Sequence, residues 1–215
     1  MKLPYDFERK MRRFTISNLM NYVVGGMALV FVLDLFAPGL RLYSLLSFNW
    51  AAIMHGQVWR LVTFIFLPPN TSLLWIIFSL YFYWMVGTTL ENQWGTFKFN
   101  LFYWVGILAN IVAGMLMGYA TNTYLNLSLF LAFAALNPNF QLLVFFVLPI
   151  KIKYLALLDV ALYVYAAITG GLPTLVMIVV SLANVILFLG GDLLNNIKRD
   201  SQYWKTRRNF RKTMK

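Results

Sequence analysis

The sequence predicts an all-α, polytopic membrane protein with six transmembrane helices, on the strength of two observations. The first is composition: of the 215 residues, 60% are hydrophobic and only 12% are charged, and the mean hydropathy is +0.68. A soluble domain cannot bury that much apolar surface. The second is pattern, because apolar residues gather in six runs, at 18–36, 71–90, 98–119, 123–137, 153–169 and 173–195.

A seventh apolar run, Phe140 to Ile150, is too short to be a further span. It has 11 residues, whereas a helix needs about 20 to cross a bilayer. It contains Pro149 and is followed by the basic Lys151 and Lys153. We therefore expect it to lie at the membrane interface or to dip in part way.

The distribution of positive charge supports six spans and predicts their orientation. Six spans place both termini on one side, and 16 of the 18 Lys and Arg residues then share that side, leaving only Arg41 and Arg60 on the other. Basic residues favour the cytoplasmic side. We therefore expect an integral, multi-pass protein with both termini in the cytoplasm, located in a bacterial cell membrane.

The same pattern divides the chain into three parts. A basic segment at 1–17 precedes the membrane domain at 18–195, and a basic tail at 196–215 follows it. Such flanks indicate attraction to anionic lipid rather than binding of nucleic acid. The bilayer itself is the first partner that the sequence predicts.

The outer loop at 37–70 is not simply polar. Leu, Phe, Trp and Ile residues alternate there with Arg41, Ser44 and Asn49, which predicts short amphipathic helices lying in the outer interface. Trp59 and Arg60 would then sit at headgroup depth, where an indole is stable and a guanidinium reaches loop carbonyls, carboxylates or phosphates. We expect Arg60 to anchor this loop, either to carbonyls or to the framework around Glu91.

Few residues are available for catalysis or for metal binding. The chain has no cysteine, and its single histidine, His55, belongs to the outer loop. With few carboxylates as well, the sequence predicts neither a metal site nor a cofactor.

Four short motifs fall at defined places among the runs. Gln57-Val58-Trp59-Arg60 closes the outer loop, Gly87 and Glu91 end the second run within GTTLENQWG, Leu136-Asn137-Pro138 follows the fourth run, and Leu189-Gly190-Gly191 lies in the sixth. Together they resemble the rhomboid superfamily, whose members have six helices, a large first loop with a Trp-Arg pair and a Gly-x-x-x-Glu ending on the second helix. The resemblance covers roughly residues 40–195 and implies a rhomboid-like bundle. Its residues are Trp59, Arg60, Gly87, Glu91, Gly190 and Gly191.

Rhomboid proteases use a serine on the fourth helix, a histidine on the sixth and a His-x-x-x-Asn pair on the second. Counted from the shared motifs, the pair falls on Trp75 and Ser79, the sixth-helix histidine on Phe188 and the serine on Thr123, with Ser128 one and a half turns later. No Gly-x-Ser-Gly is present, and every position that could supply the base is aromatic or apolar. A serine without a base is a poor nucleophile. The resemblance therefore implies a pseudoprotease rather than an enzyme.

Inactive members of the superfamily such as the derlins keep the Trp-Arg loop and lose the catalytic dyad. The resemblance implies that this chain, like them, binds transmembrane client proteins, held between the second and fifth helices, and thins the bilayer locally. The fourth and fifth runs are short enough to favour thinning. Two alternatives stay open: an active protease rearranged around His55 and Ser128, and a small-molecule transport subunit.

Polar residues inside the runs are expected to hold the helices together. Asn110, Asn126, Ser181 and Asn184 would form hydrogen bonds between helices. Asp34 and Asp159 are expected near a span end or a wet cavity, because an ionised carboxylate at mid-depth is costly. Asp192 would meet the basic tail.

Overall fold

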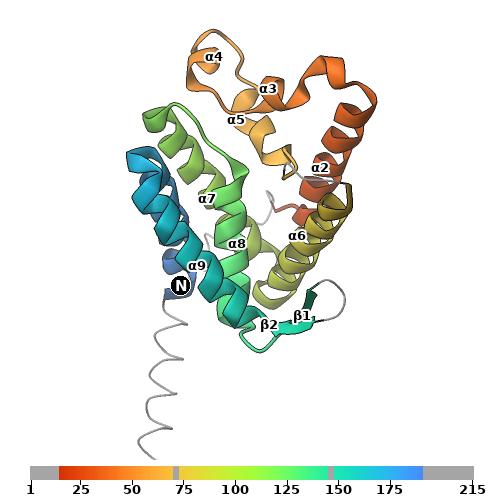
Figure 1. Cartoon of the computed structure of the whole chain (residues 1–215), viewed down its shortest axis with the longest axis vertical. Coiled ribbons are helices and arrows are strands. Elements are labelled where there is room, and N and C mark those ends of the chain that lie inside the picture. The colour runs from red at the N-terminus through yellow and green to blue at the C-terminus, as the bar shows by residue number, and fades with distance from the viewer. Residues whose placement is uncertain (1–14, 70–72, 145–147, 191–215) are drawn as a thin grey trace, which may run out of the picture.

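The computed structural model of the chain describes residues 15–69, 73–144 and 148–190 (Figure 1). Five helices in this part are long and apolar enough to cross a membrane: α2 (Leu19–Phe36), α6 (Leu73–Trp94), α7 (Thr96–Met117), α9 (Ile152–Thr169) and the helix Gly171–Gly190. A sixth apolar helix, α8 (Asn122–Leu136), has 15 residues. The predicted helical membrane bundle is confirmed, with α8 as its shortest helix. Most of the two basic flanks, Gly191 and Asp192 lie outside the described residues.

The second helix extends beyond the sequence prediction at its C-terminal end. It was expected at 71–90, but α6 runs from Leu73 to Trp94 and takes in the polar stretch around Glu91. Two polar side chains of this stretch, Glu91 and Gln93, form hydrogen bonds with other parts of the protein. The break to α7 falls at Gly95, whose φ of 80° favours glycine.

The apolar run after α8 forms a β-hairpin. Strands β1 (Gln141–Val144) and β2 (Leu148–Lys151) pair antiparallel, with Gln141 opposite Lys151. Sequence analysis placed this run at the interface or part-way into the membrane without assigning strands. A helix is disfavoured here because Pro149 breaks helical hydrogen bonding, while the aromatic and branched residues suit extended backbone.

The two ends of the bundle are built differently. In Figure 1 the short elements between α2 and α6 lie together at one end, and the hairpin lies at the other. These two ends are called the loop end and the hairpin end below. The loop end contains η2 (Pro38–Leu40), α3 (Leu42–Leu46), α4 (Trp50–Met54), α5 (Arg60–Thr63) and η3 (Phe64–Phe66). The predicted short helices of the outer loop are therefore present.

The loop elements pack onto the bundle through aromatic side chains. Phe48 and Phe64 are buried and meet edge to face, with ring centroids 5.8 Å apart. A Cβ at Gly114 of α7 would lie only 2.8 Å from the Phe48 ring, so glycine allows this close approach. Tyr43 donates a hydrogen bond to the Pro68 carbonyl at 3.3 Å. Burial raises the pKa of the Tyr43 phenol, and the charge of Asp34 adds to this, so the donor proton is retained.

The helices differ greatly in how much of their surface is covered. Helix α8 packs against α6, α7, α9 and η3, and most of its residues are buried. In α9 only Ile152 is buried, and large side chains such as Leu157, Tyr165 and Ile168 are more than half exposed. An apolar helix with this surface faces lipid. The core therefore centres on α8, and α9 lies at its edge.

Candidate functional site

Arg60 closes the outer loop by capping the end of α3. The last carbonyls of a helix have no partner within that helix. The Arg60 guanidinium donates through NH1 to the carbonyls of Ser44 at 2.6 Å and Ser47 at 2.7 Å. Thr63 donates to Leu46 at 2.9 Å. The prediction that Arg60 anchors the loop through carbonyls is confirmed.

The side chains of Trp59 and Arg60 have different exposures. Arg60 is buried, and its Nε donates to Gln57 Oε1 at 2.7 Å. Trp59 is 45% exposed, and its indole N–H reaches the Leu45 carbonyl at 3.4 Å. Together with Thr63 they satisfy the four carbonyls from Ser44 to Ser47, which explains why an apolar chain carries an arginine here.

Gly87 and Glu91 dock α2 against α6. A Cβ at Gly87 would lie 2.0 Å from Met20 Cγ, so only glycine allows α2 this close. One turn further along α6, the buried Glu91 accepts a hydrogen bond from the Asn18 backbone N–H at 2.9 Å. Asn18 precedes the first residue of α2, where a carboxylate is favoured by the helix dipole. The Gly-x-x-x-Glu spacing thus combines a close helix contact with a helix cap.

Three amide side chains form further hydrogen bonds at this end of the bundle. Two of them, Asn100 and Gln93, were not singled out by the sequence analysis. Asn100 of α7 accepts from the Ile16 N–H at 3.0 Å and donates to the Ile16 carbonyl at 2.9 Å. Gln93 and Asn137 exchange two hydrogen bonds, of 2.8 Å and 3.2 Å, between the ends of α6 and α8. Asn137 lies in the Leu-Asn-Pro motif, so that motif joins two helices rather than contributing to chemistry.

The positions matched by counting to the rhomboid serine and sixth-helix histidine lie on α8 and on the helix Gly171–Gly190. Ser128 is buried in α8, and its hydroxyl donates to the Leu125 carbonyl at 2.7 Å. Thr123 is exposed in the first turn of the same helix. Phe188 is buried against Phe102, with ring centroids 5.4 Å apart. Neither the aromatic ring nor the Leu125 carbonyl can activate the serine.

The second-helix positions lie near the loop end of α6. Trp75 is 43% exposed and its ring contacts Phe78. Ser79 donates to the Trp75 carbonyl at 2.8 Å. Trp75 thus stands where rhomboid proteases have the histidine of this pair, and Ser79 stands where they have the asparagine. The Ser79 hydroxyl forms its hydrogen bond within α6. His55 is exposed at the end of α4 in the outer loop, whereas Ser128 is buried in the middle of α8.

A polar cluster lies in the bundle interior at the level of Ser128. Tyr83 of α6 lies near Asn126 of α8, and the Asp159 carboxylate of α9 is close enough to act on the Tyr83 hydroxyl. Tyr163, one turn beyond Asp159, has its ring centroid 6.0 Å from that of Tyr124. In the described part of the chain the Asn126 carbonyl oxygen has no hydrogen-bond partner. Sequence analysis missed the tyrosines because nothing distinguishes them from the other tyrosines of the chain.

The expected interhelical hydrogen bonds are found for two of the four residues. Ser181 donates to the Tyr124 carbonyl of α8, and Asn184 donates to the Phe102 carbonyl of α7 at 3.3 Å. Asn126 lies near Tyr83 of α6. The expectation was wrong for Asn110, which donates to Gly106 of its own helix at 2.8 Å.

The two intramembrane aspartates lie at different depths. Asp34 is close to the last residue of α2, as expected. Asp159 is the eighth residue of the 18-residue α9, so of the two places expected for it, a span end or a wet cavity, the span end is excluded. It stays half-buried there because that face of α9 turns toward α6 and α8.

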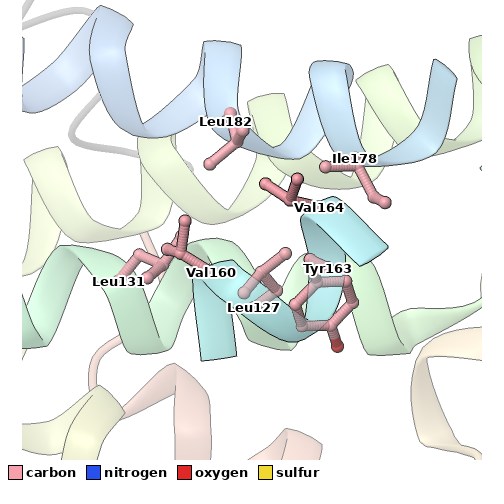
Figure 2. A pocket seen from close by; sticks show the side chains of 7 residues that line it. All are labelled: Leu127, Leu131, Val160, Tyr163, Val164, Ile178 and Leu182. Atoms are coloured by element: carbon pink, nitrogen blue, oxygen red, sulfur yellow. The ribbon is translucent and has the colours of Figure 1, made fainter. Parts of the chain in front are cut away.

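A small apolar cavity lies between α8, α9 and the helix Gly171–Gly190. Its lining is Leu127, Leu131, Val160, Tyr163, Val164, Ile178 and Leu182. In Figure 2 the Tyr163 hydroxyl points away from the other six side chains. Such a cavity offers no polar group to orient a ligand, so it does not favour a transport subunit. Among residues 15–69, 73–144 and 148–190, no cluster of His, Cys, Asp or Glu could hold a metal.

Gly190 is the last described residue of the helix Gly171–Gly190, and the one atom near a Cβ built there is Ile186 Cγ2 of the same helix, at 3.5 Å, among the described residues. Gly191, the second glycine of this motif, lies outside the described residues.

Comparison with known proteins gives one match. A family model described as a Rhomboid domain matches residues 55–194, well over half of the chain. Neither a curated protein nor a solved structure matches.

Proposed function

The chain belongs to the rhomboid family, and we propose that it is a catalytically inactive, derlin-like member that binds transmembrane segments of other proteins. One observation carries the catalytic part of the proposal: within residues 15–69, 73–144 and 148–190, no histidine lies beside a serine in the bundle. The single histidine, His55, is exposed in the outer loop, and the Ser128 hydroxyl gives its hydrogen bond to Leu125. Loss of the base removes most of the contribution of a catalytic dyad, a factor on the order of 10⁴.

Activity-based labelling tests the absence of catalysis. The purified protein in liposomes should not react with fluorophosphonate probes and should not cleave model transmembrane substrates. An active rhomboid protease, treated identically, is the positive control. Labelling that disappears in Ser128→Ala or Thr123→Ala, and also in His55→Ala, would identify a rearranged protease instead.

The lipid-facing surface of α9 supports the client-binding part of the proposal. This helix packs against α8 and offers a wide apolar surface at the edge of the bundle, and a transmembrane segment can pack there without displacing the core. A photo-crosslinker at Leu162 of α9 should capture a co-reconstituted transmembrane client. The same group at Leu29 of α2, which is similarly exposed, should capture far less. Equal capture at both positions would argue against a docking site between α6 and α9.

The length of α9 supports local thinning of the bilayer. Its 18 residues span about 27 Å and the 15 residues of α8 about 22 Å, against a hydrocarbon core of about 30 Å. Because α8 is enclosed by protein, its mismatch does not act on lipid, whereas that of α9 and of the equally long α2 (18 residues) does. Thermal stability should therefore be highest in bilayers of short acyl chains and should fall as the chains lengthen.

The charge distribution supports a cell-membrane protein with the loop end outside and both basic flanks in the cytoplasm, next to anionic lipid. Single cysteines at Ser44 and Thr213 test this orientation in the cysteine-free chain. An impermeant maleimide applied to intact cells should label Ser44→Cys only. Labelling at Thr213→Cys alone would reverse the orientation.

A further inference from the structure

The β-hairpin after α8 has one face on the bundle and one face turned away from it. Residues directly opposite each other in an antiparallel pair share a face, and neighbours along a strand alternate between faces. Leu142 packs against the core, and it and the opposite Ile150 are half-buried. Gln141, opposite Lys151, therefore lies on the outer face, as does Pro149. In agreement with this, Gln141 and Pro149 are exposed.

Exposed aromatic side chains flank the outer face of the hairpin. Phe140, just before β1, is 40% exposed, although its ring also meets that of Phe133. The Phe140 carbonyl accepts a hydrogen bond from the Ile152 N–H at 2.8 Å, which ties the base of the hairpin to the start of α9. Tyr154, in the first turn of α9, is 58% exposed. Aromatic side chains of this kind are typical of the membrane–water interface.

Two lysines stand at the same place. Lys151 precedes α9 and Lys153 lies in its first turn, with Lys153 Nζ over the Tyr154 ring at 5.0 Å. The helix dipole disfavours cations at the start of a helix, so α9 itself gives no reason for these lysines. In the described part of the chain no exposed carboxylate lies at the hairpin end: Glu91 is buried, and Asp159 is half-buried and seven residues into α9. This surface is therefore positive and partly apolar.

We call Phe140, Gln141, Pro149, Lys151, Lys153 and Tyr154 the hairpin patch. Figure 1 shows the hairpin at the end of the bundle opposite the outer loop, next to the start of α9. Helix α9 has 18 residues and spans about 27 Å, so its first turn lies where the hydrocarbon core meets the headgroups. Anionic headgroups offer negative charge and an apolar boundary together, which is what the patch requires.

We propose that the hairpin patch is a binding site for the headgroup of an anionic phospholipid. The lipid phosphate pairs with Lys151 and Lys153, and Phe140 and Pro149 lie at the boundary with the acyl chains. The site is separate in sequence from the basic flanks at 1–17 and 196–215, and it does not depend on the proposed binding of clients. Because the hairpin is tied to the start of α9, a lipid held there fixes the depth of that helix.

Quenching of a label by individual lipids tests the proposal. The full chain carries Gln141→Cys as its single cysteine, labelled with bimane, in bilayers of equal amounts of phosphatidylcholine and phosphatidylglycerol, with one or the other brominated. Brominated phosphatidylglycerol should quench more strongly, since each lysine should enrich it about fivefold at the patch. Lys151→Gln with Lys153→Gln should abolish the difference. The same label on Ser44→Cys, in the outer loop, should show none.

Charge-matched variants protect the test against misfolding and against the tail. Lys151→Glu with Lys153→Glu should make phosphatidylcholine the stronger quencher, a result that a damaged protein cannot produce. Lys205→Gln with Arg207→Gln removes the same charge from the tail and should leave the difference in place.

Three outcomes would overturn the site. Equal quenching by the two lipids in the parent protein would remove the preference for anionic lipid. A difference lost in the tail variant, or kept without the two lysines, would assign the attraction to other residues. Quenching by neither lipid would leave the hairpin patch to a protein partner with an acidic surface.

Discussion

The α2–α6–α7 side of the bundle and the α9 side are held by different means. On the first side, backbone and side-chain polar groups join the elements, as in Glu91 to Asn18 and Asn100 to Ile16, and glycine at 87 brings α2 into close contact. On the second side, α9 rests mainly on α8 and exposes nearly all of its side chains. The difference separates a rigid frame from a helix able to move with little loss of packing.

The same comparison assigns different roles to the polar residues of the spans. On the α2–α6–α7 side, Glu91 and Asn100 are bonded within the protein, and their chemistry is used for assembly. On the α9 side, Asp159 is half-buried and lies next to the exposed Leu158.

The largest predicted contrast is between two leucines. Leu90 of α6 is fully buried and Leu162 of α9 is 56% exposed. Leu90→Ala should lower the free energy of unfolding by about 2–5 kcal/mol, because it leaves a cavity in the core. Leu162→Ala should change it by less than about 0.5 kcal/mol. Unfolding in mixed micelles measures both variants, and equal effects would remove the distinction between the two sides.

A smaller effect is expected from the glycine that brings α2 and α6 together. Gly87→Ala should cost about 3 kcal/mol, at the upper end of the range for overpacking, because the new Cβ would overlap the Met20 side chain. Gly25→Ala is the matched control, since nothing lies within 4 Å of the Cβ position at Gly25 in α2. If both variants melted alike, the close contact of α2 with α6 would not matter for stability.

The smallest of the three effects is expected in the outer loop. Arg60→Ala should lower the free energy of unfolding by about 1–3 kcal/mol, because the carbonyls of Ser44 and Ser47 lose their donor. Lysine should restore little of this, since it lacks the planar fork of arginine. Arg41→Ala, at the exposed arginine of the same loop, should melt like the parent protein. An unchanged melting curve for Arg60→Ala would show that the loop is held by other contacts.

Much of the fold could be predicted from the sequence because membrane spans obey a simple constraint. A span must be apolar over its length, so composition and run length located the helices to within a few residues, and the 15-residue α8 was expected to be short. Trp59, Arg60, Gly87 and Glu91 carried the family resemblance for the same reason that they hold the fold. Each of these residues either provides a hydrogen bond at a helix end or allows two helices to come close. Such a role fixes the position of the residue relative to its neighbours in the sequence, so the motif can be recognised from its spacing.

Three-dimensional packing decided the rest. Whether a polar residue in a span bonds within its own helix, as Asn110 does, or across to another, as Asn184 does, depends on which neighbour lies beside it. The β-hairpin after α8 depends on pairing between residues four to ten positions apart. Both α8 and α9 are apolar and rich in Leu and Ala, yet one is enclosed and the other faces lipid. Apolar residues are stable both in a protein core and in a bilayer, so only tertiary contacts could tell these two helices apart.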